Sequence, residues 1–201
     1  MATSHQIKVH RLSGSMMKRL QPYFEQGIKF HGYLSPGLAL GIIMVDVAKE
    51  LLGPGRLIDA VVETKACIPD AVQLMTSCSY GNGWMRVKDW DKVALTLYDK
   101  HELDGIRVSI NWEEIRKRPL VERWLMRTGS VDKEEVTKEV IKAGRSILSW
   151  QRVRVAPYEK TTNAPLVLCS SCGETHPATD GELCTRCNGK EDYYEITDNL
   201  V

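Results

Sequence analysis

The sequence predicts an α+β fold in which a mixed, largely antiparallel sheet packs with helices. Apolar residues recur at helical spacing before residue 53 and after residue 112, whereas short apolar and β-branched runs separated by turn residues lie between them. This order favours an α+β fold over a doubly wound parallel sheet, in which strands and helices alternate throughout. Two Cys-x-x-Cys pairs near the C-terminus indicate a second, small unit.

Two helices are predicted in the first quarter of the chain. The first extends from Ser13 or Ser15 to about Ile28, and we expect Pro22 to kink it. The second extends from Pro36 to about Leu52, because Ser35 can accept a hydrogen bond as the N-cap and proline has no N–H to leave unpaired.

The second helix is expected to be buried on most sides. Only Asp46, Lys49 and Glu50 interrupt its apolar run, and Gly53-Pro54-Gly55 ends it. Gly37 and Gly41 stand four residues apart on one face, which predicts that another backbone approaches closely there.

The middle of the chain supplies most of the predicted strands. Leu57–Thr64 is apolar enough for an interior strand, and Pro69–Ser77 reads as a short helix before a turn at Ser79–Gly83. Three further strands follow, with turns around Asp89–Asp91 and Asp104-Gly105 that suit antiparallel neighbours. They are Trp84–Val87, Val93–Tyr98 and Ile106–Ile110.

Helices return after the strands. Trp112–Met126 has helical spacing that Pro119 should break, and Asp132–Trp150 predicts a stronger helix. Val153–Val155 is a last candidate strand. We assign residues 1–157 to the core, 158–168 to a connector that begins YEKTTNAP, and 169–201 to the cysteine-rich unit.

The four cysteines of this unit have the spacing of metal ligands. Cys169-x-x-Cys172 and Cys184-x-x-Cys187 are two chelating pairs that can surround one tetrahedral zinc ion. Four thiolates leave no open position, so we expect one structural zinc per chain that folds a segment too small to bury a useful core. His176 is a spare candidate ligand, but a place on the surface is the preferred interpretation.

Charge argues against nucleic-acid binding by this zinc finger. From Cys169 to Val201 the chain has seven acidic and two basic residues, whereas a phosphate backbone requires a basic surface. The segment after Cys187 decides between a treble clef and a zinc ribbon, because Tyr193–Ile196 has the composition of a strand. Ile115–Arg154 is basic in contrast, and forms either a solvated helical face or a surface for the acidic finger or an anionic partner.

The composition suits one globular core with a small appendage. Of the 201 residues, 43% are hydrophobic and 26% charged, and the net charge of +1 gives no general attraction to nucleic acid or membrane. No run approaches the roughly 20 apolar residues that span a bilayer, and Met1–Leu12 lacks the apolar stretch of a signal peptide. We therefore expect a cytoplasmic protein with reduced cysteines and no membrane partner.

The remaining chemistry lies in the core. His31, Tyr33 and Ser35 precede the second helix, whose free N–H groups and positive dipole end make a plausible pocket floor. A helix start beside a histidine bonded to backbone is the alternative.

The two core cysteines differ in their surroundings. Cys67 comes directly before a helix, where the dipole favours a thiolate, whereas Cys78 falls on the apolar face of that helix and is expected to be buried. An intervening helix puts the two about 13–16 Å apart, too far for a disulfide.

Three motifs in this order resemble those of the FmdE family, named for the E component of formylmethanofuran dehydrogenase, over roughly residues 14–190. FHGYLSPGLALG at residues 30–41 resembles the family's His-Gly-His-x-Cys-Pro-Gly motif, with Tyr33 in place of the second histidine and Ser35 in place of the cysteine. The four-cysteine tail resembles the family's auxiliary finger and implies a treble clef. Asn82 stands where a lysine is common. A second segment resembles the family's Cys-x-x-Asp-Ala-x-Gln…Thr-x-Cys-x-x-Gly at Cys67, Asp70, Ala71, Gln73, Thr76, Cys78 and Gly81.

The resulting hypothesis is a core cleft with two groups of residues. His31 is a base or metal ligand, and Cys67 and Cys78 are candidate nucleophiles or ligands. The candidate residues for binding a small polar or anionic ligand are Tyr33, Ser35, Gly37, Asp70 and Gln73. The resemblance implies a homodimer and suggests one-carbon or molybdopterin-linked redox metabolism. The alternative is a non-enzymatic zinc-bearing adaptor or assembly subunit acting through dimer and protein contacts.

Overall fold

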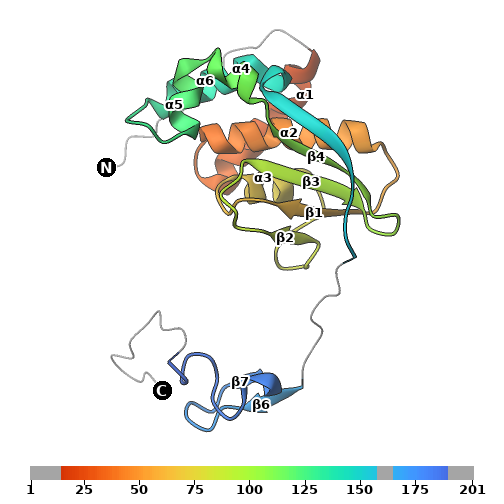
Figure 1. Cartoon of the computed structure of the whole chain (residues 1–201), viewed down its shortest axis with the longest axis vertical. Coiled ribbons are helices and arrows are strands. Elements are labelled where there is room, and N and C mark those ends of the chain that lie inside the picture. Colours follow the sequence, from red (N-terminus) through yellow and green to blue (C-terminus); the bar gives the residue numbers. More distant parts are fainter. Residues whose placement is uncertain (1–14, 158–164, 190–201) are drawn as a thin grey trace. The chain divides into compact units, whose positions relative to one another are not determined.

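The structure is a computed structural model that describes residues 15–157 and 165–189. It divides into two compact units, Met1–Ala156 and Pro157–Val201 (Figure 1), and each is described by itself. Ser13, a possible start of the first helix, and Tyr193–Ile196, a possible strand, lie outside the described residues.

The core contains one five-stranded sheet in the order β2-β1-β3-β4-β5. β1 and β2 are parallel, with Ala60 opposite Met85, and the other neighbours are antiparallel. The predicted mixed, largely antiparallel sheet is therefore confirmed. The strands are β1 (Ile58–Val62), β2 (Met85–Val87), β3 (Ala94–Asp99), β4 (Asp104–Ile110) and β5 (Leu148–Arg154).

The predicted antiparallel pairing of Trp84–Val87 with Val93–Tyr98 is wrong. The first of these strands is β2, which lies at the sheet edge, and β1 separates it from β3. After β2 the chain crosses the end of β1, where the N–H groups of Trp90 and Lys92 both donate to the carbonyl of Glu63. The turn residues therefore form a crossing instead of a hairpin.

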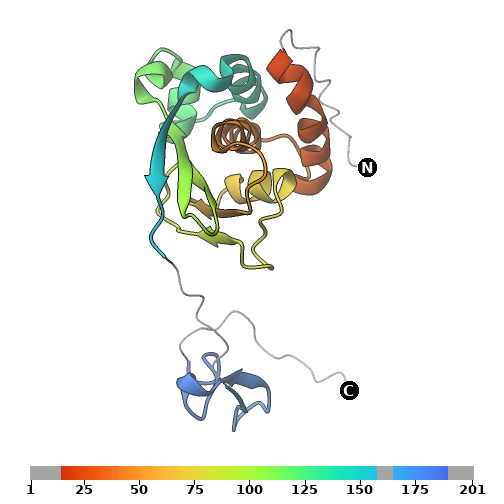
Figure 2. The same cartoon turned by 90° about the vertical axis from the view of Figure 1, so that its right-hand side faces the viewer.

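The helices pack around α2, which contacts α1, α3, α6 and the strands β3 and β4. Figure 2 looks nearly along α2, with the sheet curving along one side of it and other helices around the rest. No helix in the described part of the chain is long and apolar enough to cross a membrane. The helices are α1 (Ser15–His31), α2 (Pro36–Leu52), α3 (Ile68–Met75), α4 (Trp112–Arg116), α5 (Pro119–Leu125) and α6 (Lys133–Ala143).

Two helix predictions differ from the structure in extent. α1 continues through Pro22 to His31. The helix predicted over Asp132–Trp150 is too long, because α6 ends where Gly144 adopts a φ of 56°, and the chain then passes through one 3-10 turn into β5. The apolar residues on either side of this change fit helical and extended spacing alike.

α2 starts and ends as the sequence predicts. The Ser35 hydroxyl accepts a hydrogen bond from the Leu38 N–H at 3.0 Å, and Pro36 occupies the first turn. The polar residues that interrupt its apolar run have partners. Arg19 forms two hydrogen bonds to the largely buried Asp46, and Lys49 donates to the Met75 carbonyl at the end of α3. These contacts attach α1 and α3 to α2.

The glycines of α2 permit the close approach of α3. A Cβ atom at Gly41 would lie 2.8 Å from the Ala71 Cβ and 3.4 Å from the Ile68 Cα, both on α3. A Cβ atom at Gly37 would lie 3.0 Å from both the Cβ and the Sγ of Cys67. The two helices therefore touch at a distance that side chains would prevent.

We expect Gly41→Ala to lower the free energy of unfolding by about 1–3 kcal/mol, because the added methyl overpacks the contact with α3. Gly81→Ala is the matched control, since a Cβ there meets nothing within 4 Å. Urea denaturation followed by circular dichroism measures both, and equal stabilities of the two variants would contradict the close packing of α2 and α3.

Candidate functional site

Four side chains in the core form a continuous chain of contacts. His31 Nδ1 lies 2.6 Å from an Asp70 carboxylate oxygen, and His31 Nε2 lies 3.4 Å from the Ser35 hydroxyl. The same hydroxyl lies 3.5 Å from the Cys67 sulfur. A carboxylate, an imidazole, a hydroxyl and a thiol are thus connected in series. We call these residues, Asp70, His31, Ser35 and Cys67, the relay.

Three helix termini bring the relay together. His31 is the last residue of α1, Ser35 is the N-cap of α2, and Cys67 is the N-cap of α3 with Asp70 in the first turn. Because α3 packs against the glycine face of α2, the N-terminal ends of the two helices lie side by side. Residues 39 positions apart in the sequence, His31 and Asp70, therefore meet.

The backbone at Cys67 is unusual. Its φ is +53°, a left-handed conformation that non-glycine residues adopt rarely, and the side chain makes no capping hydrogen bond to α3. Cys67 is partly exposed, whereas the Ser35 beside it is buried. Cys67 is therefore the member of the relay that lies beside the cavity, in front of the buried Ser35.

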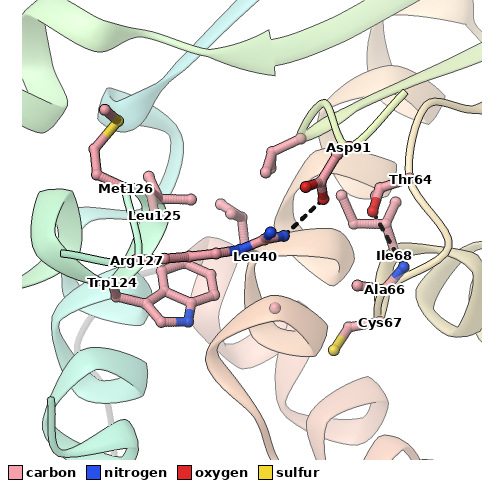
Figure 3. A pocket seen from close by; sticks show the side chains of 12 residues that line it. Leu40, Thr64, Ala66, Cys67, Ile68, Asp91, Trp124, Leu125, Met126 and Arg127 are labelled. Carbon is pink, nitrogen blue, oxygen red and sulfur yellow. Dashed lines mark hydrogen bonds and ion pairs between the residues drawn. The ribbon is translucent and has the colours of Figure 1, made fainter. Parts of the chain in front are cut away.

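Cys67 lines a cavity of about 460 Å³. Figure 3 shows its two walls: the loop after β1 with Cys67 lies on one side, and the end of α5 with Trp124 and Leu125 lies on the other. The volume is in the range of small-molecule sites. Of the predicted site residues, Cys67 and Gly37 line the cavity, while the rest of the relay lies behind Cys67.

Three other predicted site residues are not part of the relay. Tyr33 is about half exposed, with its ring centroid 5.4 Å from that of His31. The Gln73 side-chain oxygen accepts a hydrogen bond from the Tyr80 N–H. Cys78 is fully buried, its thiol donates to the Ile58 carbonyl at 3.1 Å, and burial raises the pKa of this thiol. Tyr33 therefore flanks the relay, and Gln73 and Cys78 serve the packing around α3.

Asn82, which stands where the family commonly has lysine, organises a turn. Its side-chain oxygen accepts hydrogen bonds from the N–H groups of Ser79 and Trp84, and its amide donates to the Ser77 carbonyl. The side chain therefore stabilises the predicted turn before β2 and takes no part in the cavity.

The cavity also contains residues that sequence reasoning missed. Asp91 comes from the crossing after β2, Arg127 follows α5, and Trp124 lies on the last turn of α5. An ion pair of 2.7 Å joins Arg127 to Asp91 (Figure 3). No sequence pattern connects positions 36 residues apart in two turns, so only the fold reveals this pair.

The four finger cysteines lie together, as the sequence predicts. Their four sulfur atoms lie within 4.8 Å of one another, and Cys172 and Cys184 are separated by 3.9 Å. Zinc–sulfur bonds of about 2.3 Å in a tetrahedron put sulfur atoms about 3.8 Å apart, so the site fits zinc. The N–H groups of Cys184 and Cys187 each point at a cysteine sulfur at 3.4 Å.

The finger cysteines form one metal site. Among residues 15–157 and 165–189, only the finger cysteines bring three or more Cys, His, Asp or Glu ligand atoms together. A short hairpin precedes the second cysteine pair, formed by β6 (Leu166–Leu168) and β7 (Thr175–Pro177). β6 thus occupies residues that the sequence placed at the end of the connector.

His176 is buried, contrary to the surface position expected for it. It lies on β7 opposite Val167 and is only 4% exposed. Neither ring nitrogen has a hydrogen-bond partner among the described residues, and the imidazole is not one of the four zinc ligands. The expected surface position of His176 is therefore wrong.

Known proteins match both units. Residues 30–156 match the family described as "FmdE, Molybdenum formylmethanofuran dehydrogenase operon", and residues 160–195 match the "FmdE treble clef zinc finger". The finger is therefore a treble clef with one structural zinc, and the zinc ribbon is excluded.

Two relatives illustrate the similarity. The crystal structure of a tungsten formylmethanofuran dehydrogenase FmdE-like protein from Syntrophus aciditrophicus is 40% identical, with a TM-score of 0.79, and the match covers 87% of this chain and 94% of that one. A "Probable S-adenosyl-L-methionine-binding protein" of Archaeoglobus fulgidus is 32% identical over 194 residues. That match covers 84% of this chain but 52% of the relative, so the chain spans about half of its length. With both family matches in sequence order and this shared fold, the chain belongs to the FmdE family and carries the family's treble-clef zinc finger.

Proposed function

We propose that the core binds a small polar or anionic ligand beside Cys67, and that His31 activates the Cys67 thiol through Ser35. The observation that carries this proposal is the unbroken series of contacts from Asp70 to Cys67, which ends at a cavity of about 460 Å³. Cys67 is the nucleophile of this site and His31 its general base.

The proton path follows from the donors and acceptors. An ionised Asp70 only accepts, so Nδ1 of His31 carries the proton between them and Nε2 is free to accept one. In the structure the Ser35 hydroxyl donates to the Cys67 sulfur. For proton transfer this hydroxyl turns its hydrogen to Nε2 of His31 and accepts the proton of the Cys67 thiol. The products are a thiolate and an imidazolium, which the Asp70 carboxylate stabilises.

The names of the relatives support one-carbon metabolism as the setting. One is named after an enzyme of formyl oxidation and reduction, and the other after a methyl donor. We propose that this chain handles a related one-carbon or redox metabolite, and that it does so in the cytoplasm, where the Cys67 thiol stays reduced.

The reactivity of Cys67 tests the relay. At pH 7 we expect iodoacetamide to label Cys67 at least about tenfold faster than the buried Cys78, and His31→Asn or Ser35→Ala to slow Cys67 by roughly tenfold or more. The rates of variants and parent should converge near about pH 10, where thiols ionise without a base. Peptide mass spectrometry measures each rate.

His101→Asn is the matched control, because His101 is exposed on the turn between β3 and β4. Slow labelling of Cys78 in every variant shows that the core remains folded. A His31→Asn protein with the pH profile of the parent would refute the activation of Cys67 by His31.

Metal content separates the two units. We expect one zinc per purified chain and none in Cys184→Ser, with the unfolding transition of the core unchanged, because the finger cysteines are the single metal cluster of the described residues. Elemental analysis and thermal unfolding measure both quantities. A second zinc retained by Cys184→Ser would instead assign a metal to the relay.

We also propose a second, non-enzymatic role for the finger as a contact with another copy of the chain. Strand β6 exposes three consecutive apolar residues, Leu166, Val167 and Leu168, to 64%, 38% and 68%. Exposed apolar strands of this kind favour association through the strand edge. The acidic finger also complements the basic segment Ile115–Arg154 of a second copy.

Light scattering after size exclusion tests this role. We expect the parent chain to be a dimer, and the double substitution Leu166→Asp with Leu168→Asp to make it monomeric, because both carboxylates would face the apolar contact. Thr179→Asp, exposed in the same unit, controls for added charge and should remain dimeric. A parent chain of monomeric mass would end the proposal.

A further inference from the structure

An ion pair crosses the cavity at Cys67. Arg127 follows α5 on one wall, and its guanidinium reaches Asp91 on the other at 2.7 Å (Figure 3). The two side chains are 73% and 60% exposed. An ion pair this exposed contributes little to stability, so a role in folding does not account for its position.

The partners of this pair can separate at low cost. Asp91 also interacts electrostatically with Lys65, whose pKa is raised chiefly by its hydrogen bond to Asp89 and in part by Asp91. The Asp91 side chain is 60% exposed, so its carboxylate remains hydrated when Arg127 leaves. A ligand anion that replaces Asp91 as the partner of Arg127 therefore leaves no buried charge unpaired.

Unusual backbone conformations gather at the same cavity. Cys67, Asp91 and Arg127 have φ values of 53°, 54° and 54°, and the described part of the chain contains one other non-glycine residue with positive φ, Leu103. Such conformations cost energy and cluster at ligand sites. The thiol and both members of the ion pair are therefore held in conformations that the local sequence disfavours.

Trp124 and Gly37 form part of the cavity lining near the thiol. The Trp124 indole is half-buried on the wall that carries Arg127, and a Cβ at Gly37 would lie 3.9 Å from it and 3.0 Å from the Cys67 sulfur. The absence of a side chain at Gly37 therefore leaves room between the ring and the thiol. This space suits the carbon skeleton of a ligand.

We propose that Arg127 is the anion-binding residue of this site, and that its ligand is an organic carboxylate or phosphate. The anionic group displaces Asp91 and forms a two-pronged hydrogen bond with the guanidinium. The carbon skeleton lies against Trp124 with its electrophilic atom toward Cys67. This inference rests on the proposed ligand-binding role of the cavity and names its substrate class.

Two alkylating reagents test the inference on the full chain with its zinc. In both iodoacetate and iodoacetamide the Cys67 thiolate attacks the CH2 carbon and iodide leaves, so that a carboxymethyl or a carbamoylmethyl group is attached to the sulfur. Only iodoacetate carries a carboxylate. The thiolate fraction cancels in the ratio of the iodoacetate rate to the iodoacetamide rate. This ratio therefore measures the effect of Arg127 on the anionic reagent independently of the relay. We expect this ratio to exceed that of N-acetylcysteine by roughly five- to tenfold, and to fall as NaCl is raised.

Variants assign the preference to one residue. Arg127→Gln should lower the ratio to that of N-acetylcysteine, whereas Arg123→Gln, an exposed arginine on α5 outside the cavity, should preserve it. Asp91→Asn should raise the ratio because it removes the competing carboxylate, and adding Arg127→Gln should abolish that rise. Protection of Cys67 by acetate or by inorganic phosphate, whichever acts at the lower concentration, then distinguishes carboxylate from phosphate ligands.

The outcomes are decisive. An unchanged ratio in Arg127→Gln overturns the assignment of Arg127, and a lower ratio in Asp91→Asn overturns the displacement of Asp91. A His31→Asn protein with the pH profile of the parent and an intact rate ratio would leave Arg127 supported and refute only the activation of Cys67.

Discussion

The contact between α2 and α3 is the constraint on which the core depends. Gly41 allows the Ala71 methyl and the α3 backbone to approach α2 more closely than any larger residue would permit. Because both helices begin at the same end of this contact, Ser35 and Cys67 become neighbours although 32 residues separate them. The chemistry of the core is therefore a consequence of how closely two backbones pack.

Charged residues reinforce this arrangement from the opposite end of α2. Asp46 receives two hydrogen bonds from Arg19 and one from Arg145, so α1 and the turn after α6 are both attached to a helix whose other faces are apolar. Lys49 satisfies a terminal carbonyl of α3. Such paired charges are compatible with burial because each retains hydrogen-bond partners. They fix the orientation of helices that apolar contacts alone would leave free to slide.

Much of the fold could be predicted from signals within each segment. The parts that could not be predicted depend on contacts between segments that are far apart in the sequence. Ser35 and Pro36 identified the start of α2, and Pro119 the break before α5, because caps and prolines act on their own segment. The neighbour of β2 in the sheet was predicted wrongly, because the sequence of a short strand does not indicate which strand it pairs with. α6 was extended too far because Ile147 and Leu148 suit a strand as well as a helix.

The residues of the candidate site divide in the same way, into those that local sequence signals identify and those that only the fold brings together. His31, Ser35 and Cys67 were singled out because they lie next to helix starts, and Asp70 because it matches a family motif. The structure brings these four together. Cys78 was included on the strength of a motif, although its side chain points into the apolar core. Arg127 and Asp91 were not predicted as site residues, because neither lies in a motif and the sequence does not reveal their positive φ values.

The parallel pairing of β1 with β2 has a consequence for how this site can diversify. Both strands deliver their following loops to the same edge of the sheet, and those loops supply Cys67 and Asp91. Carboxyl-terminal edges of parallel strands are places where ligands commonly bind. Substitutions or insertions in either loop can therefore change the lining of the cavity while the register of the strands beneath stays the same, so this lining can vary without a change in the core.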